Sequence, residues 1–141
     1  MSEPASTTNR RFGERRRAPA LSVITPTYNE ADNVVPLLDG LEAALADVTH
    51  EILVVDDDSP DRTWEIAERY ASTHPTVRVI RRFSDHGLSS AVMAGFEAST
   101  GSVMAVIDAD MQHDETKLPE MVSMIQAGDA DLVVGTRGAE G

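Results

Sequence analysis

The sequence predicts an α/β fold in which a mostly parallel sheet carries helices on both faces, and two observations predict it. Short apolar runs, typical of buried strands, alternate along the chain with longer segments whose apolar residues recur at helical spacing. Strands that alternate with helices favour parallel pairing, because a parallel strand can only be reached by a crossover connection. The chain has 141 residues, of which 41% are hydrophobic and 4% aromatic, so it can build one domain around a mainly aliphatic core.

Five apolar runs are the predicted strands, at residues 21–25, 51–55, 77–80, 103–107 and 132–134. Apolar residues three or four positions apart predict helices between them, over residues 34–45, 64–71, 88–95 and 118–125. Pro36 fits the first turn of the first helix, where no backbone donor is needed. Ser59 or Asp61 is expected to cap the second helix.

The first 19 residues are polar, and we predict that residues 1–19 form a disordered arm and residues 20–141 the folded part. Arginines cluster in the arm, at Arg10, Arg11, Arg15, Arg16 and Arg17. Such a cluster can bind an anionic membrane surface, where each base contributes about 1 kcal/mol. The alternative is a tail with no binding role.

The charge balance restricts the partners of the chain. With 24 acidic and 12 basic residues, the formal net charge is −12. We therefore expect no binding to nucleic acid, whose phosphates need clustered positive charge. An acidic surface occurs in ordinary soluble proteins and also favours solubility at high salt, and both interpretations stay open.

Other features of the composition concern the cellular compartment. The sequence has no cysteine, which excludes disulfides and thiolate metal sites. No apolar run approaches the roughly 20 residues of a membrane-spanning helix, and no apolar segment of a signal peptide is found near the N-terminus. We expect a cytoplasmic protein whose contact with the cell membrane would be peripheral, at the cytoplasmic face.

Polar and acidic residues follow the predicted strands. The segments that come directly after the first, second, fourth and fifth strands are Pro26–Glu30, Asp56–Ser59, Asp108–Asp114 and Gly135–Arg137. The carboxyl ends of parallel strands meet at one edge of the sheet, where α/β proteins bind their ligands. Several carboxylates at one edge repel one another unless a cation joins them, so this edge is the predicted functional site.

The strongest metal candidates are Asp108 and Asp110. Side chains two positions apart on an extended segment point the same way, so both carboxylates can reach one hard cation, Mg²⁺ or Mn²⁺. Gln112 is two positions further on and can complete the metal shell or contact phosphate oxygens. The alternative is a solvated acidic turn with no ligand.

Three more residues at this edge have both a binding and a structural interpretation. Asp57 can hydrogen-bond a nucleoside base or ribose, as acids at this place do in nucleotide-binding α/β folds, or it can help to cap the next helix. Tyr28 can stack on a base or cover the end of the sheet. Glu30 can accept a hydrogen bond from a base or cap the first helix.

Five segments together carry a resemblance to a known family. They are Pro26–Glu30, Val54–Asp61, Gly87–Ala91, Asp108–His113 and Gly135–Arg137. In order and spacing the chain resembles the family-two glycosyltransferases from about Leu21 onward. Within that family the stretch from Asp108 to His113 and the final Gly-Thr-Arg are most similar to the polyprenyl-phosphate sugar synthases of the dolichyl-phosphate mannose synthase group.

The resemblance implies a GT-A fold, a divalent metal, and transfer of a hexose with inversion. The donor would be a nucleoside-diphosphate sugar of the GDP-mannose or UDP-glucose type, and the acceptor a polyprenyl or dolichyl phosphate. The residues that it places in the nucleoside pocket are Pro26, Tyr28, Glu30, Val55 and Asp57. Those that it places at ribose, diphosphate and metal are Asp108, Ala109, Asp110 and Gln112. Arg137 would face a phosphate of donor or acceptor, and Asp110 and Arg137 would be the catalytic residues.

The chain departs from the family pattern in two ways. Arg62 stands where family members usually have glycine, a change expected to alter only a turn. The family's catalytic domain also usually continues well beyond residue 141, so we expect residues 20–141 to be the donor-binding part, completed by further chain, a second chain or an oligomer. A non-catalytic nucleotide-sugar-binding fragment is the alternative.

A remote alternative is a signalling receiver domain, because residues 52–58 also resemble the acidic opening strand of such domains. Asp108 would then accept the phosphoryl group. The order of elements disfavours this interpretation, since a full strand–helix unit precedes the acidic run. The lysine that a receiver carries after its last strand is also missing from that place, because the single lysine is Lys117.

Overall fold

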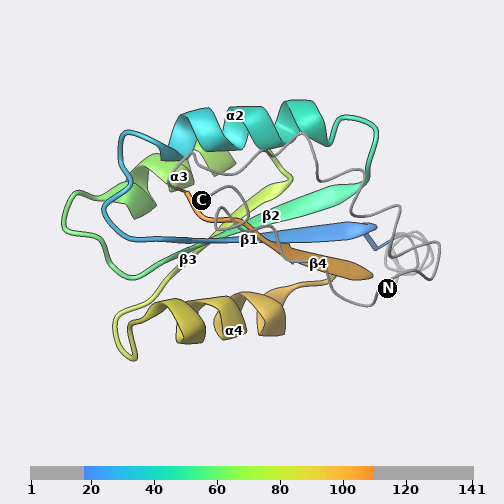
Figure 1. Cartoon of the computed structure of the whole chain (residues 1–141). Coiled ribbons are helices and arrows are strands. Elements are labelled where there is room, and N and C mark those ends of the chain that lie inside the picture. The colour runs from blue at the N-terminus through green and yellow to red at the C-terminus, as the bar shows by residue number, and fades with distance from the viewer. Residues whose placement is uncertain (1–17, 110–141) are drawn as a thin grey trace, which may run out of the picture.

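The computed structural model describes residues 18–109, which form a parallel sheet between helices (Figure 1). In chain order the elements are β1 (Leu21–Thr27), α2 (Val34–Ala44), β2 (His50–Asp56), α3 (Thr63–Ala71), β3 (Val77–Arg81), α4 (Leu88–Ala98) and β4 (Val103–Val106). Each falls on a predicted strand or helix, with ends shifted by at most three residues. Residues 1–17 of the predicted arm (residues 1–19), the helix predicted over 118–125 and the strand predicted over 132–134 lie outside the described residues.

The four strands pair in the order β3-β2-β1-β4, and all pairs are parallel. Helices α2 and α3 cover one face of the sheet and α4 covers the other (Figure 1). The α/β prediction is therefore confirmed. The order also disfavours the receiver alternative, because a receiver sheet has its second strand at one edge, in the order 2-1-3-4-5, whereas 3-2-1-4 is the order of dinucleotide-binding folds.

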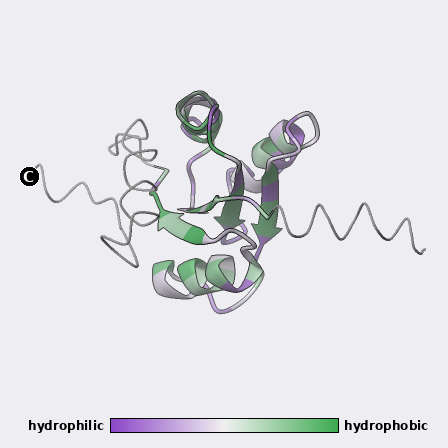
Figure 2. Ribbon diagram, turned by 90° about the vertical axis from the view of Figure 1, so that its right-hand side faces the viewer, coloured by the Kyte–Doolittle hydropathy of each residue, from purple (hydrophilic) through white to green (hydrophobic). Residues whose placement is uncertain are grey.

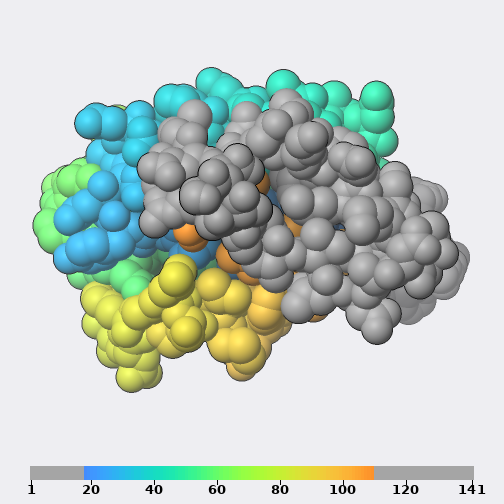
Figure 3. Space-filling view, in the orientation of Figure 1, coloured from blue at the N-terminus to red at the C-terminus, as the bar shows by residue number. Residues whose placement is uncertain are grey.

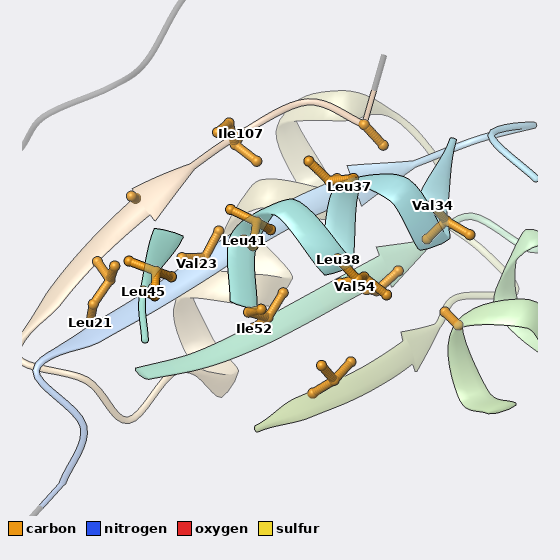
Figure 4. Close-up of a cluster of buried hydrophobic side chains, with 14 of the residues drawn as sticks. Leu21, Val23, Val34, Leu37, Leu38, Leu41, Leu45, Ile52, Val54 and Ile107 are labelled. Carbon is orange, nitrogen blue, oxygen red and sulfur yellow. The ribbon is translucent and has the colours of Figure 1, made fainter. Parts of the chain in front are cut away.

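The sheet separates two apolar clusters. The larger lies under α2 and α3 and includes Leu21, Val23, Leu38, Leu41 and Ile52, all fully buried (Figure 4). The smaller lies under α4 and is built on Ile24, Val55 and Ala91. Figure 2 shows the resulting pattern, with apolar colouring concentrated on the strands between the helices. Because both faces of β1 and β2 are covered, these strands are buried along almost their whole length and do not alternate between buried and exposed residues.

Pro26 marks the place where β1 and β4 separate. The amide of Ile107 donates to the carbonyl of Ile24, so alternate residues of β1 direct their backbone groups toward β4. Pro26 is two residues further along and has no amide hydrogen, so the hydrogen-bond ladder to β4 cannot continue through it. The β1–β4 pairing accordingly ends at Ile24 and Val106. This gap is where the connections change from one face to the other, the usual ligand site of such sheets.

The start of α3 distinguishes the two predicted caps. The Asp61 carboxylate accepts hydrogen bonds from the amide and the hydroxyl of Thr63, the first residue of α3. Ser59 instead bonds to residues of the strand ends. Of the two residues that the sequence offered, Asp61 is therefore the side chain that satisfies the beginning of this helix.

Arg62 lies between Asp61 and the first residue of α3, with φ 65° and ψ 35°. This is the left-handed region that glycine adopts without steric cost. Arg62 therefore occupies a glycine-type turn.

Within residues 18–109, none of the helices has the length and apolar character needed to cross a bilayer.

Candidate functional site

A pocket of about 530 Å³ opens at the carboxyl edge of the sheet, between the segment after β1 and the start of α4. Its lining residues are Pro26, Thr27, Tyr28, Glu30, Asp57, His86, Gly87, Leu88 and Ala91. In Figure 3 the segment after β1 (blue) and the start of α4 (yellow) face the same side of the molecule. The structure brings four of the predicted site residues, Pro26, Tyr28, Glu30 and Asp57, to this one pocket, and their binding of a nucleoside stays a prediction.

A buried carboxylate, Asp56, holds the two loops on one side of the pocket. One of its oxygens accepts hydrogen bonds from the hydroxyls of Thr27, at 2.6 Å, and Ser59, at 2.7 Å. Its other oxygen accepts from the Ser59 amide at 2.8 Å. The Ser59 hydroxyl in turn accepts from the Asn29 amide at 2.9 Å. The Asp56 side chain is thus a structural tie between the ends of β1 and β2, and it fixes the loop that carries Tyr28.

A second set of contacts fixes Glu30. Its amide donates to the Thr63 hydroxyl at 3.0 Å, and the Asp61 carboxylate accepts from the Ala31 amide at 3.1 Å. Burial by itself raises the pKa of Asp61, but the hydrogen bonds from Thr63 and Ala31 outweigh it, so this pKa lies below its ordinary value. One Glu30 carboxylate oxygen accepts from the Asn33 side chain at 2.8 Å. The same residue therefore contributes to the start of α2 and to the pocket wall.

Asp57 lies at the floor of the pocket in a nearly buried ion pair with Arg82. The Arg82 Nε donates to Asp57 Oδ1 at 2.8 Å, and the two side chains are 12% and 10% exposed. Asp57 Oδ2 accepts from the Gly87 amide at 2.8 Å. Each carboxylate oxygen has a second lone pair, so these contacts leave Asp57 able to accept from a ligand in the pocket.

The far wall of the pocket is the start of α4. Gly87 precedes the helix with φ 137°, a conformation that side chains rarely adopt. Because its amide is bonded to Asp57, this glycine joins the helix to the end of β2. Glycine at position 87 is therefore explained by the turn that enters α4.

Asp108 and Ala109 follow β4, on the other side of the gap that Pro26 opens. Ala109 is buried, with 2% of its surface exposed, and Asp108 is half-buried. The remaining predicted site residues, Asp110, Gln112 and Arg137, lie outside the described residues. Within residues 18–109 there is no group of three or more His, Asp or Glu side chains that could hold a metal ion.

Three further differences from the sequence prediction concern the pocket. Val55 is fully buried in the core under α4 and is not among the lining residues. His86 and Leu88 line the pocket but were not predicted to do so. Arg82 was also missed, although it directly follows β3, because its link to Asp57 joins residues 25 positions apart. The glycine at position 87 was the available signal of an unusual turn in this loop, and its φ of 137° bears that out.

Comparison with known proteins identifies the family. The family model described as glycosyl transferase family 2 matches residues 22–141. A dolichol-phosphate mannosyltransferase of Pyrococcus furiosus is 47% identical over 121 residues, which cover 86% of this chain and 34% of that protein. A dodecaprenyl-phosphate galacturonate synthase of Rhizobium johnstonii is 33% identical over 120 residues, with 83% and 36% covered. The chain thus spans about a third of the length of these curated relatives.

Solved structures give the same result. A mannosyltransferase from Pyrobaculum calidifontis, in complex with GDP-Man and Mn²⁺, matches with a TM-score of 0.60 and 32% identity, over 66% of this chain and 28% of that one. The TarS protein of S. aureus in complex with UDP-GlcNAc matches with a TM-score of 0.64 and 27% identity, over 76% and 31%. The GT-A class of fold is thereby confirmed, and the chain belongs to glycosyl transferase family 2.

Proposed function

We propose that the chain is the donor-binding part of a glycosyltransferase. The enzyme moves a hexose from a nucleoside-diphosphate sugar, of the GDP-mannose or UDP-glucose type, to a polyprenyl or dolichyl phosphate. The observation that carries this proposal is the pocket at the β1–β4 gap, because it brings Pro26, Tyr28, Glu30 and Asp57 to one site. The names of the relatives support a lipid-phosphate acceptor.

The nucleoside would lie in this pocket. Tyr28 is 54% exposed at its rim and offers an aromatic face for a base. Glu30 and Asp57 offer carboxylate acceptors for the N–H groups of the base or the hydroxyls of ribose. Asp108 follows the neighbouring strand, so the diphosphate would extend from the pocket toward it.

A divalent cation, Mg²⁺ or Mn²⁺, would be held by Asp108, Asp110 and Gln112. Carboxylate and amide oxygens are the donors that these hard cations prefer. The position of Asp108 beside the β1–β4 gap fits this role, and the manganese complex of the Pyrobaculum mannosyltransferase supports it. When bound, the cation would stabilise the negative charge that develops on the leaving diphosphate.

The reaction itself needs little from the protein beyond binding and orientation. A phosphate oxygen of the acceptor forms a bond to the anomeric carbon while the bond from that carbon to the diphosphate breaks. A single displacement of this kind inverts the configuration. The acceptor phosphate is already ionised at neutral pH, so the chain needs no general base. Asp110 would act through the cation that it holds, and Arg137 by binding a charged phosphate group.

The acceptor places the enzyme at a membrane. We propose peripheral contact of the protein with the cytoplasmic face, with the arginines of residues 10–17 as candidates for binding anionic lipid. Sedimentation with vesicles that contain anionic lipid, compared with neutral vesicles, tests this contact. Binding that is equal for both vesicle types would contradict the arginine assignment.

Calorimetry tests donor binding directly. GDP-mannose and UDP-glucose are titrated into the chain with and without Mn²⁺, and into the Asp110→Ala variant. We expect Mn²⁺-dependent binding that weakens at least about tenfold in the variant, as loss of a metal ligand does. Asp114→Ala is the matched control, since it removes an acid of the same stretch to which no metal role is assigned.

The outcomes separate the proposed function from its alternatives. No nucleotide binding under any metal would refute the glycosyltransferase site, and phosphorylation of Asp108 by acetyl phosphate would favour the receiver. Donor binding without turnover would indicate the non-catalytic binding fragment. Release of GDP or UDP only after addition of a polyprenyl phosphate would instead support the full reaction.

A further inference from the structure

Arg82 occupies a central place in the wall of the pocket without lining it. Its Nε contacts Asp57. Its NH2 group donates to the Ser90 hydroxyl at 2.9 Å and to the Gly87 carbonyl at 3.3 Å. Its amide donates to the carbonyl of Asp56 at 2.8 Å. One side chain thus joins the end of β2, the loop before α4 and the first turn of α4.

This geometry fixes the plane of the Asp57 carboxylate. Arg82 holds Oδ1 and the Gly87 amide holds Oδ2, so neither oxygen can rotate without losing a charge-assisted hydrogen bond. The pair is nearly buried, so water competes little for these contacts. The lone pairs that remain on Asp57 are therefore held in a constant direction, and Asp57 lines the pocket.

Arg82 also offsets the negative charge of the Asp57 carboxylate. The pocket has two carboxylates in its lining, Asp57 and Glu30, and the proposed ligand is an anionic nucleoside diphosphate. An unpaired carboxylate at the floor would repel such a ligand, whereas a carboxylate paired with a guanidinium keeps its acceptor geometry with little net charge. This arrangement suits a hydrogen-bond acceptor that recognises the uncharged nucleobase.

We propose that Arg82 is a positioning residue that sets nucleobase selectivity through Asp57. The inference rests on the proposed function, because it assumes that the pocket receives the nucleoside. A fixed carboxylate accepts a hydrogen bond from guanine N1–H or uracil N3–H. Adenine N1 and cytosine N3 carry no hydrogen and would place a lone pair against the carboxylate, which disfavours them. The Asp57–Arg82 pair therefore selects for bases with a ring N–H.

The test measures selectivity, which a merely structural residue would not change. Binding of GDP, UDP, ADP and CDP is measured by calorimetry with Mn²⁺ on the full chain, on Arg82→Met and on Arg82→Lys. We expect the preference of the wild-type chain for GDP or UDP over ADP and CDP to fall at least about tenfold in both variants, because a site built on a directed hydrogen bond loses discrimination when its acceptor can turn. Lysine keeps the charge but cannot hold Asp57 and Ser90 together.

Arg78→Met is the matched control. Arg78 lies on β3, the strand that Arg82 follows, and also pairs with a buried carboxylate, Glu51, but at the opposite edge of the sheet. This variant should lose stability and keep the base preference. Circular dichroism confirms that each variant is folded before binding is compared.

The results distinguish the inference from the function on which it rests. If the wild-type chain binds no nucleotide, the proposed function and this inference both fail. If it binds all four nucleotides equally, or if Arg82→Met and Arg82→Lys weaken all four by the same factor, only the role of Arg82 is refuted. A preference that falls in the Arg82 variants and persists in Arg78→Met supports the role.

Discussion

Thr25 carries a buried hydroxyl with no hydrogen-bond partner, the single such side-chain atom in residues 18–109. It lies in the middle of β1, opposite Val54, and is fully buried. A buried polar group without a partner has lost its hydration and gained nothing in exchange. Thr25 is therefore a site where the sequence departs from the apolar pattern of its strand at a cost in stability.

We predict that Thr25→Val raises the free energy of unfolding by about 1 kcal/mol, because valine has nearly the same shape and needs no partner. Urea denaturation followed by the fluorescence of Trp64, the single tryptophan, measures it. Thr27→Val is the matched control on the same strand. The Thr27 hydroxyl donates to Asp56, so that substitution should lower stability by about 1–3 kcal/mol. A loss of stability in Thr25→Val would contradict the prediction.

Arg62 is a residue whose backbone conformation conflicts with its type, with φ 65°. A side chain in the left-handed region costs about 1–2 kcal/mol relative to glycine. The exposed contacts of Arg62 with Glu65 and the face of Trp64 recover only part of this cost. We predict that Arg62→Gly stabilises the protein by roughly 0.5–1 kcal/mol, measured as a rise in the denaturation midpoint.

Arg62→Ala separates the effect of the backbone conformation on stability from the effect of the side-chain contacts. Alanine removes the same contacts with Glu65 and Trp64 but keeps the Cβ atom that makes the conformation unfavourable. It should therefore be neutral or slightly destabilising. Equal stability of the alanine and glycine variants would show that backbone strain at this position has no measurable cost.

At the scale of elements, the packing of α4 on the sheet depends on a close approach. Gly95 faces Ile24 of β1, and a Cβ atom at position 95 would lie 2.5 Å from the Ile24 Cγ2 and 2.8 Å from its Cγ1. Both γ carbons are attached to the branched Cβ of Ile24 and cannot move aside together. Glycine at this position sets the distance between α4 and the sheet, and hence the position of the pocket wall at the start of α4.

We predict that Gly95→Ala destabilises the protein by about 1–3 kcal/mol through overpacking, although alanine is the better helix former by about 1 kcal/mol. Thermal unfolding measures the loss. Gly40→Ala, at a partly exposed position inside α2, is the control and should be neutral or stabilising. The losses of stability caused by Gly95→Ala and Ile24→Ala should not add in the double variant, because Ile24→Ala removes the atoms that clash. Additive losses would refute this contact as the cause.

The elements were predictable from sequence because their signals are local. Apolar runs and helical spacing give β1 to β4 and α2 to α4, and the acidic segments after the strands give the edge at which Asp57 and Asp108 lie. The organisation of the pocket wall was not predictable. The link from Asp57 to Arg82 joins positions 25 apart, and the link from Asn29 to Ser59 joins positions 30 apart. Such contacts depend on strand register, which no local pattern specifies.

At the scale of the whole molecule, the edge opposite the pocket is held by one buried carboxylate. Glu51 accepts hydrogen bonds from the Ser22 hydroxyl at 2.6 Å, from the amide and hydroxyl of Thr100, and from Arg78 at 2.9 Å. The Ser22 hydroxyl also accepts from the Gly101 amide at 2.8 Å. These contacts join β1, β2, β3 and the turn before β4, so the start of every described strand is tied to Glu51.

Low pH should lower the free energy of unfolding through Glu51. Burial by itself raises the pKa of Glu51, but the hydrogen bonds from Ser22, Thr100 and Arg78 outweigh it and bring the pKa below the value of about 4.3 for an unfolded chain. A carboxyl with a lowered pKa binds its proton more readily when unfolded. The stability that it contributes is therefore complete above the unfolded pKa and is lost as pH falls through the folded one.

We predict that Glu51→Gln lowers the free energy of unfolding at pH 7 by about 1–3 kcal/mol and flattens its decline below about pH 5. Urea denaturation at a series of pH values from neutral to acid measures both effects. Glu68→Gln, at an exposed position of α3, should reproduce the wild-type curve. An acid decline that is as steep in Glu51→Gln as in the wild type would show that other carboxylates govern acid unfolding, and that Glu51 ties the strand starts together without sensing pH.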